Sequence, residues 1–261
     1  MSLQKSGYHR IGLSLFAFFN LLLWFTPSMP LRAEEILVAT ASNFAVPMEQ
    51  ITTDFERQFG HNVTLVFGSS GRLFAQIQHG APFQLFLSAD QEKPAALESA
   101  GYIVHGSRFT YARGHLVLWS NDIERAIEGP AALQQDWSRL ALANPELAPY
   151  GRAAQEVLTR LGLLESTRSR WIMGENIAQA YQFVATSNAD LGFVALSQLV
   201  GGESGFPNRG WLVPTEYYGP ILQDAVLLTS AQSCAACRQL FDYLQSEPVQ
   251  QQLTRFGYLR P

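Results

Sequence analysis

Cysteine, positive charge and long apolar runs are all scarce in this sequence. It has two cysteines, 18 Lys plus Arg and 22 Asp plus Glu among 261 residues. No segment reaches the roughly 20 consecutive apolar residues that a membrane-spanning helix needs. Low-complexity tracts, heptads and internal repeats are also absent, which excludes coiled-coil and repeat architectures.

The first 33 residues are typical of a secretory signal peptide. Lys5 and Arg10 lie in a basic start, an apolar stretch follows over residues 11–25, and Leu31-Arg32-Ala33 ends on a small residue suited to cleavage. The alternative is a membrane anchor, but the apolar stretch is too short for a spanning helix. We therefore predict removal of residues 1–33. We expect no lipidation of the mature chain, because no cysteine stands directly after the cleavage site.

Loss of the signal peptide makes the chain more acidic. Lys5, Arg10 and Arg32 leave with it, so 15 Lys plus Arg face 22 Asp plus Glu, a formal net charge of −7. A chain of this charge does not attract nucleic acid or an anionic membrane. It also provides no long-range attraction for an anion, so any anion site has to be local and strong.

The two cysteines form the motif Cys234-Ala235-Ala236-Cys237 near the C-terminus. In an exported protein such a pair is open to oxidation, and residues three apart on a helix lie on one face. A thioredoxin-like redox motif would follow an early strand, whereas this pair opens the penultimate expected helix. We favour a structural or incidental pair, with its redox state left open.

Short apolar strands alternate with amphipathic helices along the mature chain. This alternation predicts an α/β fold with parallel sheets covered by helices on both faces. Strands are expected over residues 36–40, 63–67, 83–88, 116–120, 140–143, 191–195 and 225–229, and helices over residues 45–59, 73–79, 94–100, 151–161, 177–187, 234–245 and 248–256.

The alternation stops around residues 104–113 and again over residues 201–220, which are rich in Gly and Pro. We therefore expect two lobes, each a mostly parallel sheet flanked by helices. The first comprises residues 34–113 with 218–261, and the second residues 114–217. Ligand would bind in the crevice between the lobes, at the carboxyl ends of the strands.

Small polar residues follow the first two expected strands and stand directly before helices. These are Ser42-Asn43 and Gly68-Ser69-Ser70-Gly71. A helix N-terminus offers unpaired N–H groups and about half a unit of positive charge, and hydroxyl groups add donors. Helices starting near Tyr150 and Ile177 would face them from the second lobe. Each feature alone is an ordinary helix cap, but together they are the parts of an anion cradle without Lys or Arg.

Several short motifs run in a fixed order along the mature chain. They are Ala39-Thr40-Ala41-Ser42-Asn43-Phe44, Phe67-Gly68-Ser69-Ser70-Gly71, Gly80-Ala81-Pro82, Phe86-Leu87-Ser88-Ala89-Asp90, Ala148-Pro149-Tyr150-Gly151 and Ala189-Asp190-Leu191-Gly192-Phe193-Val194. With these motifs, residues 34–261 resemble the periplasmic molybdate-binding proteins of ABC transporters. The resemblance implies a two-lobed periplasmic-binding-protein fold. It also implies a monomer without cofactor or nucleic-acid partner, which passes molybdate to an inner-membrane ABC permease.

In that family, serine hydroxyls and backbone N–H groups from both lobes hold the oxyanion. By the resemblance, Ser42 and Ser70 supply hydroxyl groups from the first lobe. Tyr150 and Ile177 supply backbone N–H groups from the second.

A fifth contact is open, because some members place a tyrosine hydroxyl after the Leu-Gly-x-Val strand, where this sequence has Ala195. Asn43 is the natural replacement, since its side-chain amide can donate, and we rank it just below the other four residues.

Neutral donors suit a fully ionised tetrahedral dianion, because hydrogen phosphate would also need an acceptor. The resemblance implies molybdate. Tungstate, nearly the same size, should bind as well. Sulfate meets the same chemical requirement, and only the size of the cavity separates it from molybdate.

An alternative to an oxyanion receptor is a ferric-ion receptor. Some iron-carrying periplasmic receptors ligate ferric ion through adjacent tyrosines, and Tyr217-Tyr218 is such a pair. Such a site also needs a His or carboxylate nearby, and we favour packing for this pair. Gly68-Ser69-Ser70-Gly71-Arg72 matches neither a nucleophile elbow nor a Walker loop. No nucleophile–base or acid–base pair has a recognisable spacing, so we expect a receptor rather than an enzyme on the same fold.

Overall fold

The computed structural model describes residues 1–3, 33–200 and 210–261, and residues 33–261 form one compact unit. The predicted signal peptide lies outside the described residues, except for its first three residues and Ala33. Within the described ranges, no helix is both long and apolar enough to cross a membrane.

The first of two five-stranded sheets has the strand order β2-β1-β3-β10-β4. β1 pairs in parallel with β2 and β3, whereas β10 runs antiparallel to both β3 and β4. The sheet is thus parallel apart from one reversed strand. Its strands are β1 (Glu35–Ala41), β2 (Asn62–Gly68), β3 (Leu85–Leu87), β4 (Phe109–Gly114) and β10 (Ile221–Leu227).

The second sheet repeats this plan with the order β7-β6-β8-β5-β9. β6 is parallel to β7 and β8, and β5 is the reversed strand between β8 and β9. Two mostly parallel sheets were predicted, and the structure has them. The strands are β5 (Leu116–Trp119), β6 (Leu140–Ala143), β7 (Trp171–Gly174), β8 (Leu191–Ala195) and β9 (Gly210–Leu212).

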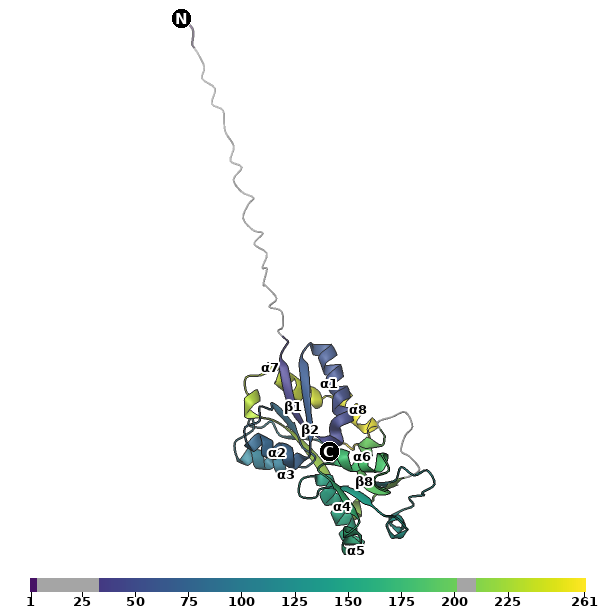
Figure 1. The fold of residues 1–261 in the computed structure, drawn as a ribbon. Coiled ribbons are helices and arrows are strands. Elements are labelled where there is room, and N and C mark those ends of the chain that lie inside the picture. Colours follow the sequence, from purple (N-terminus) through teal and green to yellow (C-terminus); the bar gives the residue numbers. More distant parts are fainter. Residues whose placement is uncertain (4–32, 201–209) are drawn as a thin grey trace. The chain divides into compact units, whose positions relative to one another are not determined.

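Helices flank both sheets (Figure 1). Those of the first sheet are α1 (Ala45–Phe59), α2 (Ser70–Gln78), α3 (Glu92–Ser99), α7 (Ala235–Leu244) and α8 (Glu247–Arg255). Those of the second are α4 (Pro149–Arg160), α5 (Leu164–Arg168) and α6 (Ile177–Ala185). The 3-10 helices are η1 (Ser42–Phe44), η2 (Pro130–Gln134), η3 (Leu196–Gln198), η4 (Thr215–Tyr217) and η5 (Thr229–Ala231).

Each sheet is buried on both faces, because successive side chains of a strand point to opposite sides. In β1, Ile36 and Val38 pack into a core with α1, α7 and α8, whereas Ala39 packs on the other face with α2 and α3. In β5, Leu118 and Trp119 likewise belong to different cores. This two-sided burial explains why the strands are continuous apolar runs in the sequence.

Three strands and one α-helix were not predicted, namely β4, β7, β9 and the five-residue α5. The three strands are all edge strands. β7 and β9 have only four and three residues, and Thr110 and Arg113 interrupt the apolar pattern of β4. β10 was expected over residues 225–229 but spans Ile221–Leu227. Its first half was missed because the buried polar residues Gln223 and Asp224 interrupt the apolar pattern in the sequence.

The chain crosses between the sheets twice. β4 ends at Gly114 and β5 begins at Leu116, while the return lies between β9 and β10. These crossings are compatible with the expected lobes, residues 34–113 with 218–261 and residues 114–217, and those boundaries stay a prediction.

Cys234 and Cys237 form a disulfide with a Cα–Cα distance of 5.2 Å. Cys234 is the N-cap residue of α7, and Cys237 is completely buried in the core of the first lobe. This position agrees with the structural interpretation of the pair.

Candidate functional site

All five residues predicted to bind ligand line one small pocket. Ser42, Asn43 and Ser70 come from the first lobe, and Tyr150 and Ile177 from the second. The pocket adjoins Ala41 and Gly68, the last residues of β1 and β2. It therefore lies at the carboxyl ends of parallel strands, as predicted. The remaining lining residues are Ser69, Ala89, Ala148 and Pro149.

The pocket has a volume of about 10 Å³, and a cavity of roughly 10–15 Å³ holds one water-sized group. None of the lining residues has a charged side chain.

At the start of α2, the local hydrogen bonds leave one backbone donor unused. Ser69 caps the helix by accepting from the N–H of Arg72, and the N–H of Gly71 donates to Leu147 O at 2.9 Å. Among the described residues, no acceptor bonds to the N–H of Ser70. The hydroxyl oxygen of Ser70 accepts from the N–H of Ala89 at 2.9 Å, which leaves the hydroxyl proton available to a ligand.

α6 begins in the same way on the opposite wall. The side chain of Asn176 accepts from the N–H groups of Ala178 and Gln179 at 3.0 and 3.1 Å. The N–H of Ile177, the first residue of α6, has no acceptor in the described parts of the chain. It is therefore the free donor of this helix start.

α4 contributes the third helix start. Pro149 has no N–H group, and the N–H groups of Gly151 and Arg152 both donate to Ala148 O. The N–H of Tyr150 is thus left without a partner among the described residues. Proline at the first position of a helix suits this role, since its ring fixes φ and removes a donor that would need a partner.

Ser42 lies in η1, between β1 and α1. Its side chain is buried, and no group in the described residues hydrogen-bonds to its hydroxyl. Together, the four helix starts bring hydroxyl and N–H donors to one uncharged pocket.

The side-chain amide of Asn43 was predicted to donate to the ligand, but in the structure it donates to other residues of the protein. Its amide nitrogen donates to Gln223 Oε1 at 2.8 Å and to the hydroxyl of Tyr258 at 3.0 Å. Both amide hydrogens are therefore used within the protein. The backbone N–H of Asn43, in the first turn of η1, is the donor that this residue can still offer.

Gln223 ties this part of the site to both lobes, a role that sequence reasoning missed. Its Oε1 lies 2.9 Å from the hydroxyl of Tyr111, and its Nε2 donates to the hydroxyl of Tyr150 at 3.3 Å. Burial raises the pKa of Tyr111 and of Tyr150 well above the usual value, so both hydroxyl groups stay protonated. The polar Gln223-Asp224 pair in an otherwise apolar strand was the signal that could have revealed it.

Ala195 does not line the pocket. It is completely buried, and its N–H donates to Gln198 Oε1 at 2.9 Å. The amide of Gln198 in turn donates to Ile177 O at 3.2 Å, so this segment supports the start of α6.

The adjacent tyrosines pack, as predicted. The hydroxyl of Tyr218 accepts from the N–H of Leu116 at 3.2 Å, and the ring of Tyr217 packs edge-on against Trp211 at a centroid distance of 5.8 Å. Within residues 1–3, 33–200 and 210–261, no group of three or more His, Cys, Asp or Glu is arranged to hold a metal ion.

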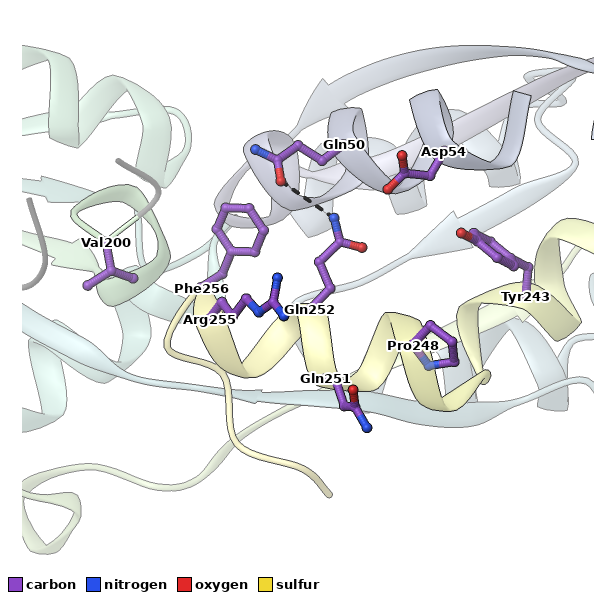
Figure 2. A pocket seen from close by; sticks show the side chains of 9 residues that line it. All are labelled: Gln50, Asp54, Val200, Tyr243, Pro248, Gln251, Gln252, Arg255 and Phe256. Atoms are coloured by element: carbon purple, nitrogen blue, oxygen red, sulfur yellow. Dashed lines mark hydrogen bonds between the residues drawn. The ribbon is translucent and has the colours of Figure 1, made fainter. Parts of the chain in front are cut away.

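A larger pocket of about 530 Å³ lies elsewhere, beside α1 and α8 (Figure 2). Its polar side chains include Gln50 and Gln252, whose amides are 3.5 Å apart. It contains none of the predicted ligand residues, and it borders Val200, where the described chain is interrupted.

The fold and the pocket are those of a two-lobed solute receptor. Residues 36–259 match the sequence model of the family described as bacterial extracellular solute-binding protein, and the chain belongs to that family.

Among its relatives is the molybdate-binding protein ModA of Azotobacter vinelandii, which is 47% identical over 228 residues, covering 87% of this chain and 90% of the relative. ModA of Rhodobacter capsulatus is 44% identical, covering 89% and 91%. The solved structure of the Azotobacter vinelandii periplasmic molybdate-binding protein superposes with a TM-score of 0.84 and 38% identity, covering 87% of this chain and 99% of that one.

Proposed function

We propose that this solute-binding protein is the molybdate receptor of an ABC importer. The observation that carries the proposal is the small uncharged pocket, where three helix starts each leave one backbone N–H without a partner in the described residues. Ser42 and Ser70 would add their hydroxyl groups, and Asn43 its backbone N–H. The names of the relatives at 47% and 44% identity support molybdate as the oxyanion.

The donor set favours a fully ionised tetrahedral anion. A dianion stripped of water is costly to bury, and charge-assisted hydrogen bonds of roughly 1.5–3 kcal/mol each offset that cost. N–H groups cannot accept a hydrogen bond, and the oxygen of Ser70 already accepts from the N–H of Ala89, so a protonated anion such as hydrogen phosphate would have to rely on the oxygen of Ser42. Helix N-termini supply positive potential without a counter-ion that would hold the anion too firmly to release it.

Tungstate should bind with similar affinity, since its size and charge are nearly those of molybdate. Sulfate is smaller, and we propose that it makes fewer simultaneous hydrogen bonds in the same cradle. The lining residues include no nucleophile–base pair and no carboxylate, which supports a binding rather than a catalytic role.

We also propose that the receptor works in the periplasm. With residues 1–33 as a signal peptide, the mature chain would act in the periplasm as a monomer without cofactor. It would close its lobes on the anion and present the closed form to an inner-membrane permease.

Titration of the purified mature protein with oxyanions tests the proposal. Tryptophan fluorescence, with five tryptophans in the chain, should change on adding micromolar molybdate or tungstate, and not on adding phosphate. Sulfate binding as tight as molybdate binding would contradict the specificity. An absorbance band on adding ferric ion would favour the iron alternative instead.

A further inference from the structure

The carboxylate of Glu175 bridges the two lobes beside the pocket. Its Oε1 accepts from the hydroxyl of Ser69 at 2.9 Å, and its Oε2 lies 2.8 Å from a guanidinium nitrogen of Arg72. Glu175 lies between β7 and α6 in the second sheet's lobe, whereas Ser69 and Arg72 belong to the start of α2 in the first. One side chain thus makes an ion pair and a hydrogen bond across the crevice.

The bridge joins residues that lie within two positions of proposed ligand donors in the chain. Ser69 precedes Ser70, and Glu175 is separated from Ile177 only by the cap residue Asn176. The backbone bond from Gly71 N–H to Leu147 O also crosses between the lobes at this point. Closing the bridge therefore sets the distance between a donor on α2 and a donor on α6.

A second ion pair crosses between the lobes. Arg152 on α4 lies 2.8 Å from Glu92 on α3, and both side chains are about half exposed or more. In the other pair the side chain of Arg72 is 58% exposed, but that of Glu175 is 24% exposed and has the additional hydrogen bond from Ser69. Exposed pairs contribute little, so Glu175 is the more effective of the two contacts.

We propose that Glu175 is a positioning residue that holds the α2 and α6 donors around the bound anion and thereby slows ligand release. This inference rests on the proposed oxyanion-binding function. Glu175 does not line the pocket, so it acts through Ser69 and Arg72 rather than on the ligand.

Arg72 compensates the negative charge of Glu175, which would otherwise repel an anion in the nearby pocket. Burial raises its pKa, but the hydrogen bonds from Ser69 and the charge of Arg72 outweigh that effect and lower the pKa below its usual value. The carboxylate is therefore ionised at neutral pH and paired with Arg72. Arg72 consequently has two effects: it completes the bridge and cancels a negative charge near the pocket.

The substitution Glu175→Asp tests the bridge without changing the charge of the side chain. The shorter side chain keeps the negative charge but cannot reach Ser69 and Arg72 together. The matched control is Glu165→Asp, because Glu165 pairs with Arg168 within α5 and does not cross between lobes. Stopped-flow tryptophan fluorescence with molybdate gives association and dissociation rate constants for both variants and the parent protein.

We expect Glu175→Asp to raise the dissociation rate constant about three- to tenfold, the loss typical of one or two partly exposed polar contacts. The melting temperature of the ligand-free protein should stay unchanged, as should all values for Glu165→Asp. Arg72→Gln should also speed release, and Arg72→Lys should restore part of the loss.

An unchanged dissociation rate in Glu175→Asp would overturn the positioning role while leaving the proposed function intact. If the parent protein does not bind molybdate, the proposed function fails. Small-angle scattering then tests the bridge separately: Glu175→Asp should populate a more open form than Glu165→Asp without ligand, and identical scattering would overturn the bridge as well.

Discussion

The amide nitrogen of Asn43 lies 2.8 Å from Oε1 of Gln223 and donates a hydrogen bond to it. The two residues are 180 positions apart in the chain, and both are buried. Around this bond, the hydroxyl of Tyr258 lies 2.9 Å from Asn43 O, and the hydroxyl of Ser197 donates to the same oxygen at 2.8 Å. Asn43 therefore anchors η1, and with it Ser42, to elements from distant parts of the sequence.

Asn43→Ala should destabilise the protein even without ligand. The substitution breaks two buried hydrogen bonds and leaves a cavity, and each lost buried partner costs about 1–3 kcal/mol. We expect the free energy of unfolding in urea to fall by about 2 kcal/mol or more. Asn188→Ala is the control, since Asn188 is exposed and bonds only to the nearby Thr186. Unchanged urea stability with lost ligand binding would mean that the side chain acts on the ligand after all.

Ser70→Ala should weaken ligand binding directly. The change removes one hydroxyl donor, and a hydrogen bond to a charged ligand contributes about 1.5–3 kcal/mol, so the Kd for molybdate should rise about 10- to 100-fold. Calorimetric titration gives the Kd. Because Ser70 also accepts from Ala89 N–H, the melting temperature of the ligand-free protein should fall slightly. Ser99→Ala, an exposed position on α3, should change neither value, and an unaltered Kd in Ser70→Ala would place the site elsewhere.

Gly71→Ala should impair closure without unfolding the protein. A Cβ atom at this position would lie 2.9 Å from Leu147 O, across the lobe interface, whereas alanine favours helix within α2. Overpacking of this kind costs roughly 1–3 kcal/mol, so the Kd should rise about tenfold. The melting temperature of the ligand-free protein should be unchanged or higher. Gly219→Ala, where the nearest atom is 3.7 Å away, is the control; equal affinity in the two variants would argue against a closed ligand-bound form of this shape.

Asp190 should contribute stability that depends on pH. Its Oδ2 accepts from the N–H groups of Ser138 and Arg139, both at 2.8 Å. Burial raises its pKa, but these hydrogen bonds and the charge of Arg125 outweigh burial and lower the pKa below the ordinary 3.8. A lowered folded-state pKa means stability that is present above the unfolded-state pKa and is lost as pH falls through the folded-state pKa.

Asp190→Asn should therefore lower the melting temperature at pH 7, and the difference from the parent protein should shrink as the pH drops below 3.8. Melting curves across a pH series measure this. Asp242→Asn on the exposed side of α7 should leave the profile unchanged. A difference for Asp190→Asn that stays constant with pH would show that the charge of Asp190 is not the cause.

The buried elements and the candidate site were predictable because their signals are local. Strands such as β1 and β6 are apolar runs, and Ser42 and Ser70 stand where a strand gives way to a helix, so neighbouring residues alone indicate their place. The edge strands β4, β7 and β9 give weaker signals, since β7 and β9 have only four and three residues and Thr110 and Arg113 interrupt the apolar pattern of β4. Gln223 and Glu175 were missed because their partners are distant in the chain: Asn43 is 180 residues from Gln223, and Ser69 is 106 residues from Glu175.

The sequence by itself determined the α/β class and the order of the main elements, since apolar strands and helix caps are local patterns. It also indicated five of the residues that line the pocket: Ser42 and Ser70 from their place at strand–helix junctions, and Asn43, Tyr150 and Ile177 by the resemblance. Only the tertiary structure decided how those residues are used. In the structure the amide of Asn43 donates to Gln223 and Tyr258, and Glu175 contacts Ser69 and Arg72. Within the described residues, one N–H at the start of each of α2, α4 and α6 has no acceptor. Hydrogen bonds between distant segments depend on geometry within about 3 Å, and no local pattern in the chain specifies that geometry.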